Sequence, residues 1–208
     1  MISLKMILKI SSYDLINSIK VAYWKTISRI WFSLFLKKLG HNSYIRKPLF
    51  ITPQFIELGS NVLIRDNCRI EGVYLNNLKE NTPNIYIGDN VNIEQNLHLT
   101  CSCKVVIGKH TSLASNVTIT DIKHPYEDIF TPPERQPLYT EKVIIGENCK
   151  IYNNAVITHG VILNNHTIVG ANSVVVKGEY PAYVVLSGTP AKIIRKYEIT
   201  QNKWVKCI

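Results

Sequence analysis

One histidine of this chain stands where acid–base chemistry is expected. His124 is followed by a proline, at the start of a segment that is rich in proline and poor in aliphatic residues. Imidazole titrates near neutral pH, so a histidine can take a proton from a reacting group in a transition state. Asp121, Glu127 and Asp128 lie within four residues and could orient the ring, or be solvated loop acids. This pattern favours His124 as a general base.

The cysteines do not show the spacing of a metal site or of a disulfide framework. Five are present, an odd number, without a CxxC pair or a histidine at zinc-ligand distance: Cys68, Cys101, Cys103, Cys149 and Cys207. Spacing of this kind is typical of reduced thiols in a cytosolic protein. We therefore expect no metal.

Length and composition indicate one folded domain with an appendage. The chain has 208 residues, of which 46% are hydrophobic and 19% charged, a balance that argues against intrinsic disorder. The net charge of +9 is concentrated in residues 1–50, which hold nine basic side chains and one acid, Asp14. The remainder is nearly neutral. Because no nucleic-acid-binding motif accompanies the basic residues, we expect no nucleic-acid partner.

Residues 1–50 are predicted to form a basic amphipathic helical segment. Ser11 or Ser12 could cap a helix and Gly40 could end it. Apolar residues recur at steps of three or four, at Ile16, Ile19, Tyr23, Ile27, Ile30 and Leu34. This helix could pack on the main domain or a sister subunit, or residues 1–40 could rest on an anionic membrane. With no targeting signal or membrane span, we expect a cytoplasmic protein, possibly at the inner face of the membrane.

From residue 51 to 196 the chain follows a different rule, a repeat of six residues. Aliphatic residues occupy every sixth position in four runs: Leu58, Ile64, Ile70; Ile87, Ile93, Leu99; Ile107, Leu113, Ile119; and Ile145, Ile151, Ile157, Leu163, Val169, Val175. A helix would distribute a period of six around its axis, whereas a three-sided coil of short strands buries one such residue per face. Small or β-branched residues precede the next aliphatic by two positions, and Gly and Asn supply the corners.

The repeat breaks at residues 121–142, which we expect to form a loop that leaves the coil, and residues 197–208 form a C-terminal tail. On these residues, the chain resembles the hexapeptide-repeat acyltransferases, and above all their galactoside, maltose and polysaccharide O-acetyltransferase branch. The resemblance implies an all-β fold: a left-handed parallel β-helix with an extruded loop, here preceded by the helical segment. In that family the catalytic histidine stands at the base of the loop, where this chain has His124.

The resemblance also implies a donor and its site. Acetyl-CoA is the expected co-substrate, without a metal, and the string from Ser187 to Lys196 resembles the closing motif of the family. By position, Lys192 and Arg195 would meet the CoA phosphates, or form a basic tail that caps the coil. The positions that match the rest of the donor groove are Asn153, Ala171, Val176 and Lys177.

The acceptor side departs from the family. Glu94 and Asn96 fall in the stretch that would meet the acceptor, and Glu94 replaces an asparagine of the galactoside branch. Lys150, followed by Tyr152, stands where that branch has a tryptophan. These differences argue against a plain galactoside, and Asp121, Glu94 and Asn96 are retained as possible orienting or acceptor residues.

The resemblance implies a homotrimer with active sites between subunits and a sugar or glycan acceptor. We expect O-acetylation of a surface polysaccharide, such as O-antigen or capsule, or of its precursor. Alternatives are acetylation of a small xenobiotic or free sugar, N-acetylation of an amino sugar, and a non-catalytic β-helix binding protein. The spacing of His110, His124 and His159 does not match the metal-dependent carbonic-anhydrase-type β-helices.

Overall fold

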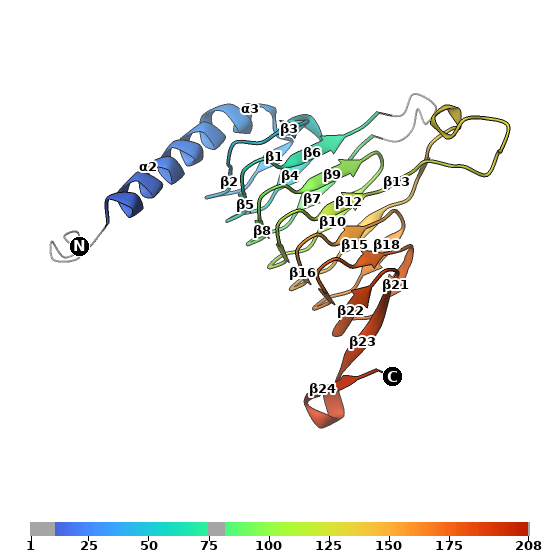
Figure 1. Ribbon diagram of the computed structural model, residues 1–208. Helices are drawn as coiled ribbons and strands as arrows, with labels where there is room; N and C mark the ends of the chain where they lie inside the picture. The colour runs from blue at the N-terminus through green and yellow to red at the C-terminus, as the bar shows by residue number, and fades with distance from the viewer. Residues whose placement is uncertain (1–10, 75–81, 208) are drawn as a thin grey trace.

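The computed structural model describes residues 11–74 and 82–207 and shows a three-sided coil of short strands (Figure 1). Consecutive strands belong to three sheets in turn, so each circuit of the chain adds one strand to every sheet. Strands one circuit apart pair in parallel, as in the register of Ile87 with Ile107 and of Ile93 with Leu113. The predicted β-helix of hexapeptide repeats is confirmed.

The strands of the three sheets are short and evenly spaced. The first sheet contains β1 (Lys38–Leu39), β4 (Ile56–Leu58), β7 (Ile85–Ile87), β10 (Val105–Ile107), β15 (Val143–Ile145), β18 (Val161–Leu163) and β21 (Gly178–Tyr180). The second contains β2 (Tyr44–Ile45), β5 (Leu63–Ile64), β8 (Asn92–Ile93), β11 (Ser112–Leu113), β16 (Lys150–Ile151), β19 (Ile168–Val169), β22 (Val184–Gly188), β23 (Ala191–Glu198) and β24 (Lys203–Lys206). The third contains β3 (Phe50–Ile51), β6 (Arg69–Gly72), β9 (His98–Cys101), β12 (Thr118–Thr120), β17 (Val156–Ile157) and β20 (Val174–Val175).

The six-residue period places one aliphatic side chain of each strand on the axis of the coil. In the second sheet these residues are fully buried and stack in register from one circuit to the next: Ile45, Ile64, Ile93, Leu113, Ile151, Val169 and Leu186. The small residues near the corners are buried as well, and burial raises the pKa of the Cys68 thiol to about 11. A thiol that stays protonated is unreactive and fills the corner as a small apolar group.

Asparagines at the corners hold the circuits together. They adopt left-handed backbone conformations, which Asn tolerates better than most residues: Asn61, Asn67, Asn90, Asn96, Asn116, Asn148, Asn154 and Asn172. At one corner their amides form a ladder, because Asn96 donates to Asn116 at 2.9 Å and Asn116 donates to Asn154 at 3.0 Å. The ladder pairs side chains that β-strand hydrogen bonds cannot reach.

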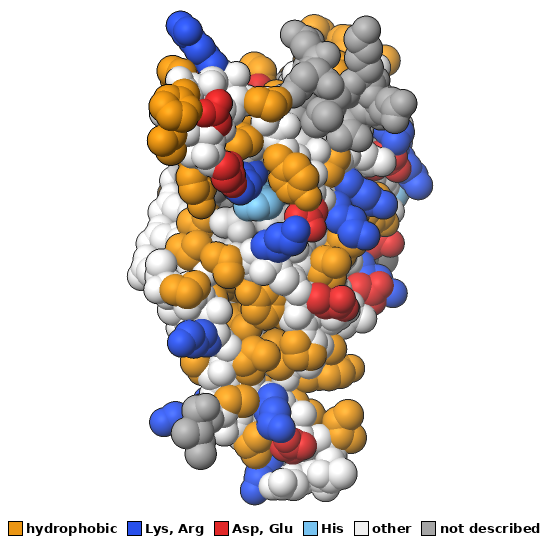
Figure 2. All heavy atoms as spheres, turned by 90° about the vertical axis from the view of Figure 1, so that its right-hand side faces the viewer, with side chains coloured by type: hydrophobic (Ala, Val, Ile, Leu, Met, Phe, Trp, Pro, Cys, Tyr) orange, Lys and Arg blue, Asp and Glu red, His pale blue; other side chains and the backbone are white. Residues whose placement is uncertain are grey.

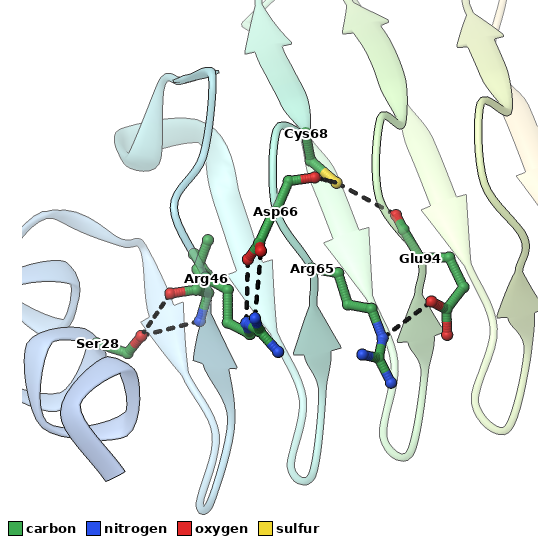
Figure 3. Close-up of polar contacts among 7 residues, drawn as sticks. Ser28, Arg46, Arg65, Asp66, Cys68 and Glu94 are labelled. Carbon is green, nitrogen blue, oxygen red and sulfur yellow. Dashed lines mark hydrogen bonds and ion pairs between the residues drawn. The ribbon is translucent and has the colours of Figure 1, made fainter. Parts of the chain in front are cut away.

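The N-terminal segment is helical and closes the end of the coil. It consists of α2 (Ser12–Ile27), the π-helical turn η1 (Ser28–Phe32) and α3 (Ser33–Phe35), and the Ser11 hydroxyl caps α2 by accepting the Asp14 N–H at 3.1 Å. The buried Ser28 hydroxyl accepts the Ile45 N–H at 2.8 Å (Figure 3). Phe32 and Leu36 join the core, so the segment covers the first circuit.

The coil extends further in both directions than the repeat predicts. Strands β1 and β2 and the first residue of β3 lie within residues 1–50, because Leu39, Ile45 and Ile51 already follow the six-residue spacing. The turn η2 (Pro53–Phe55) then adds one residue before the next circuit, which hides this continuity. At the other end, the 3-10 turn η4 (Ile199–Gln201) joins β23 and β24 into an antiparallel hairpin, so the tail is folded on the second sheet.

The chain leaves the coil after Thr120 and returns at β15, without a change in the register of the circuits on either side. The loop starts and ends in a short antiparallel pair, β13 (Ile122–Lys123) with β14 (Tyr139–Thr140), and contains the 3-10 turn η3 (Pro133–Arg135). Figure 1 shows the loop projecting from the coil on the side away from α2. The excursion predicted from the break in the repeat therefore stands on a two-stranded stem.

The stacked aliphatic residues should dominate stability. Ile151 is fully buried between its register partners Leu113 and Val169. We expect Ile151→Ala to lower the free energy of unfolding by about 2–5 kcal/mol, through lost burial and the cavity that remains. Urea unfolding followed by circular dichroism measures the loss.

Ile199→Ala is the matched control, because the Ile199 side chain is 77% exposed and should change the unfolding free energy by less than about 0.5 kcal/mol. Equal losses in the two variants would contradict the assignment of the core.

Candidate active site

His124 lies at the base of the extruded loop, directly after β13. The β13–β14 pair fixes the stem, since Lys123 is in register with Tyr139. The imidazole is 54% exposed, and its Nδ1 lies 4.0 Å from the Glu134 Oε1. The loop thus holds the half-exposed His124 beside Glu134. The spacing of the sequence did not reveal this pairing.

A groove in front of His124 runs along the third sheet. Its volume is about 550 Å³, and its lining residues come from β6, β9, β12 and the loop: Arg69, Glu71, Val73, His98, Thr100, Thr118, Thr120, Ile122, His124 and Leu138. Thr100 and Thr120 lie on neighbouring strands and share a hydrogen bond of 2.9 Å. Arg69 and Glu71 form an ion pair within one strand. Hydroxyls, a histidine and an ion pair beside His124 make this groove suitable for a polar molecule.

The groove residues were missed by the sequence reasoning, although a signal was present. In the third sheet the residues next to the buried aliphatics face outward, so His98 and Thr100 flank Leu99, and Thr118 and Thr120 flank Ile119. Alternation along a strand identifies such positions. Only the loop, whose residues Ile122, His124 and Leu138 line the same groove, marks these positions as a site.

The Asp121 carboxylate bonds to the backbone of the coil and not to His124. Its side chain is fully buried, and its carboxylate accepts N–H bonds from Ser102 at 2.7 Å, Cys103 at 2.8 Å and Lys104 at 2.8 Å. These donors form the corner that follows β9 on the preceding circuit. The backbone of Asp121 also accepts the Glu141 N–H at 2.9 Å. Asp121 therefore fastens both ends of the loop to the coil, rather than orienting the imidazole.

The two other loop acids considered from the sequence are also engaged elsewhere. Lys123 Nζ lies 2.6 Å from Glu127, and this hydrogen bond lowers the pKa of the Glu127 carboxyl to about 2. Asp128 accepts the Phe130 N–H at 2.9 Å, and its bond with the Thr131 hydroxyl lowers its pKa. Both acids stabilise the loop itself.

The predicted acceptor residues do not line the groove beside His124. Glu94 and Asn96 precede β9, whereas the lining of the groove begins at His98 on that strand. Figure 3 shows Glu94 paired with Arg65, at 2.9 Å. Asn96 is committed to the corner ladder through Asn116. Within one subunit, neither residue is brought to the His124 groove.

Two of the predicted donor residues lie at the same corner of the coil as the loop stem. Val176 and Lys177 follow β20, and Lys177 Nζ lies 2.6 Å from Glu141, at the end of the loop. His159 follows β17 at this corner and meets the Tyr139 ring edge-on, with centroids 6.3 Å apart. Burial lowers the pKa of His159, although Glu141 opposes the shift.

The remaining donor residues lie on other parts of the last circuits. Asn153 and Ala171 occupy corresponding turns before β17 and β20, and the Asn153 carbonyl accepts the Asn172 N–H at 3.0 Å. Lys192 and Arg195 lie exposed on β23, in register with Ser187 and Val185. The structure groups all these positions in the C-terminal half of the coil, but one chain does not bring them into a single pocket.

Lys150, the other departure from the family pattern, points away from the core on the second sheet. Its Nζ is 2.9 Å from the Ser112 Oγ and 5.6 Å from the centroid of the Tyr152 ring. The Lys150 ammonium group therefore lies over the Tyr152 ring on this outward face of the coil.

The face that carries the loop combines charged and apolar side chains. Figure 2 shows basic and acidic side chains gathered on its upper half and hydrophobic side chains continuing below them.

Among residues 11–74 and 82–207, no cluster of three or more His, Cys, Asp or Glu side chains could hold a metal ion. None of the helices in the same part of the chain has the length and hydropathy of a membrane span.

Comparisons with known proteins agree with this architecture. Residues 142–177 match the family model "Bacterial transferase hexapeptide (six repeats)". The chain is 36% identical over 129 residues to WbbJ of Escherichia coli (strain K12), whose name assigns it provisionally to lipopolysaccharide biosynthesis as an O-acetyl transferase. It is 33% identical over 113 residues to the galactoside O-acetyltransferase of the same organism. These alignments span 59% and 54% of this chain, and 65% and 54% of the relatives.

Among solved structures, the coil is similar to AntD, an N-acyltransferase from Bacillus cereus in complex with dTDP and coenzyme A. The TM-score is 0.64 at 18% identity, over 85% of this chain and 90% of that one. The chain is thus a left-handed parallel β-helix built of hexapeptide repeats, and its residues 142–177 match the hexapeptide transferase model. Its sequence is similar to the O-acetyltransferases of sugars and polysaccharides.

The buried carboxylate of Asp121 should be essential to the loop stem. Asp121→Ala leaves three N–H groups of residues 102–104, one in a buried and two in part-buried hydrogen bonds, without their acceptor, and we expect it to lower the free energy of unfolding by about 3 kcal/mol. Asp121→Asn keeps one acceptor oxygen and should lose less. Urea unfolding measures the loss, and trypsin cleavage within the loop reports the loosened stem.

Glu134→Ala serves as the control, because that side chain is 87% exposed. It should change stability by less than about 0.5 kcal/mol. If Asp121→Ala unfolded like this control, the carboxylate would not fasten the loop.

Proposed function

We propose that the protein transfers an acetyl group from acetyl-CoA to a sugar hydroxyl, with His124 as the general base. The observation that carries the proposal is the half-exposed His124 at the loop stem of a hexapeptide coil, facing a groove lined by hydroxyls. The names of WbbJ and of the galactoside O-acetyltransferase support the class of reaction.

In the proposed reaction, His124 takes the proton of the acceptor hydroxyl as its oxygen attacks the thioester carbonyl. The carbon–oxygen bond forms, a tetrahedral oxyanion develops, and the carbon–sulfur bond then breaks. The proton held by His124 passes to the leaving thiolate, so the products are the acetyl ester and CoA. Glu134, 4.0 Å from the Nδ1, would stabilise the imidazolium through its charge. A backbone N–H at a corner of the coil would stabilise the oxyanion.

The groove in front of His124 is proposed to receive the acceptor. Its threonines, His98 and the Arg69–Glu71 ion pair offer both donors and acceptors, as sugar hydroxyls require. WbbJ is named for lipopolysaccharide biosynthesis, which favours a surface polysaccharide, such as O-antigen or capsule, or its precursor. Because AntD is an N-acyltransferase, N-acetylation of an amino sugar is the second candidate.

The CoA donor is proposed to lie along the last circuits. Lys192 and Arg195 would pair with its phosphates, and Asn153, Ala171, Val176 and Lys177 would line the pantetheine arm. These residues do not form one pocket within a subunit, and the His124 groove is open on one side. Both facts favour a homotrimer in which a neighbouring coil supplies the second wall of each site.

His124 provides the direct test of the proposed activity. His124→Ala should lower kcat by about 100- to 10,000-fold, since proton transfer in the transition state is lost. CoA affinity, measured by isothermal titration calorimetry, should remain within about threefold, because we place the ring on the acceptor. Mass spectrometry of candidate glycans incubated with acetyl-CoA measures turnover, and hydroxylamine distinguishes labile esters from stable amides.

The control is His110→Asn, which replaces a histidine at a corner with φ of 58° by the residue most corners carry. This variant should retain activity. An active His124→Ala enzyme would refute the assigned base, and amide products would favour the N-acetylation candidate.

The donor assignment is tested by charge reversal on β23. Lys192→Glu and Arg195→Glu should each raise the KM for acetyl-CoA about tenfold or more, with little change in kcat, because each loses a charge-assisted contact with phosphate. Lys203→Glu alters the charge of the neighbouring strand β24 equally and should leave KM unchanged. If all three variants behaved alike, a general field of the tail would explain the effect.

A further inference from the structure

The helix α2 touches the rest of the molecule along only part of one side. Its first nine residues are exposed, and partly buried side chains begin at Val21 and continue at Trp24 and Lys25. The contact continues through Ser28 and Phe32, which are buried. Figure 1 shows α2 extending away from the coil toward its N-terminal end. Most of the helix surface is therefore available for another partner.

Most of the apolar stripe predicted from the sequence is on this free surface; Ile27 is the exception, because it packs against the core. Ile30 is 64% exposed between the buried Ser28 and Phe32, so it faces away from the coil. The stripe on that side consists of side chains that are each more than half exposed: Leu15, Ile16, Ile19, Tyr23 and Ile30. Trp31, Leu34 and Phe35 extend the exposed apolar surface beyond it. We call these eight residues the outer face.

Basic side chains border the outer face. At about 100° per residue, Lys20 and Arg29 lie about a quarter turn to either side of Ile19 and Ile30. Among residues 11–50 there are seven basic side chains and one acid, Asp14, at the far end of the helix. An apolar stripe flanked by cations is typical of a helix in the plane of an anionic membrane, where the long side chains reach the headgroups.

A basic pocket lies between the helical segment and the first circuit. Its volume is about 400 Å³, and its lining contains no acidic side chain: Lys25, Arg29, Ser33, Leu39, Gly40, His41, Asn42 and Ser43. Lys25 Nζ is held by the Asn42 Oδ1 at 2.9 Å. Arg29 forms no ion pair within the described part of the chain. Two cations in a pocket without an acidic side chain match the charge of a phosphate headgroup.

We propose that residues 12–36 dock on the surface of an anionic bilayer. The outer face enters the boundary between headgroups and acyl chains, and the pocket of Lys25 and Arg29 takes a lipid phosphate. A second copy of the chain fits this surface less well, because a self-association through this surface would bring two basic borders together. The inference does not depend on the proposed acetyl transfer.

Vesicle co-sedimentation of the full chain tests the proposal. The protein should bind vesicles of phosphatidylglycerol and phosphatidylcholine, lose most of this binding at high salt, and bind pure phosphatidylcholine vesicles at least tenfold more weakly. Ile16→Glu with Ile19→Glu should reduce binding about tenfold or more, and so should Arg29→Glu. Lys206→Glu changes the charge at the opposite end of the chain by the same amount as Arg29→Glu and should bind like the wild type.

The readouts separate this proposal from its rivals. Binding needs no acetyl-CoA, so an inactive enzyme that binds vesicles would refute the proposed function alone. The proposal is overturned if the wild type ignores anionic vesicles, or if the variants bind as Lys206→Glu does. It is also overturned if sedimentation velocity shows that Ile16→Glu with Ile19→Glu dissociates an oligomer while the wild type leaves vesicles unbound, because the outer face would then be a subunit contact.

Discussion

Every part of this molecule depends on one rule: an aliphatic side chain at each sixth residue must come to rest on the one from the circuit before. In the second sheet, Ile64, Ile93 and Leu113 meet in register and are fully buried. A shift by one residue would expose the whole set, because neighbouring residues of a strand face opposite sides. The corners must therefore have constant length, and left-handed asparagines such as Asn90 meet that demand.

A coil of regular circuits has flat surfaces. The candidate site lies where the six-residue repeat is interrupted. Residues 121–142 leave between two circuits whose strands, β10 and β15, still pair in register. Stem residues of the loop, such as Ile122 and His124, line one groove together with outward threonines of the third sheet. The insertion thus adds a wall that the regular coil lacks. The helical segment is a second addition of this kind, because it covers the open end of the core and leaves its own apolar stripe outside.

The sequence predicted the structure best where residue types recur at a fixed period. The repeat predicts the coil, and the break in the repeat predicts the loop. Of the two cap candidates, Ser11 and Ser12, Ser11 caps the helix. His124 was selected by its place at the break, and no contact shown here tests its role. The partners of the loop were not predictable, since Asp121 bonds to the corner of an earlier circuit and Glu134 approaches His124 only through the fold of the loop. The outer side of the helix was also hidden, because the apolar stripe read from spacing could equally have been the packed side.

One consequence concerns how such a protein can change. The carboxylate of Asp121 and the register of β10 with β15 join the two ends of the excursion to the coil at its exit point. The residues between those ends contribute little to the stacked core. Their sequence and length can therefore diverge while the scaffold stays the same, which makes the insertion an exchangeable module. A coil built in this way can take a different segment at this point while its stacked core stays unchanged.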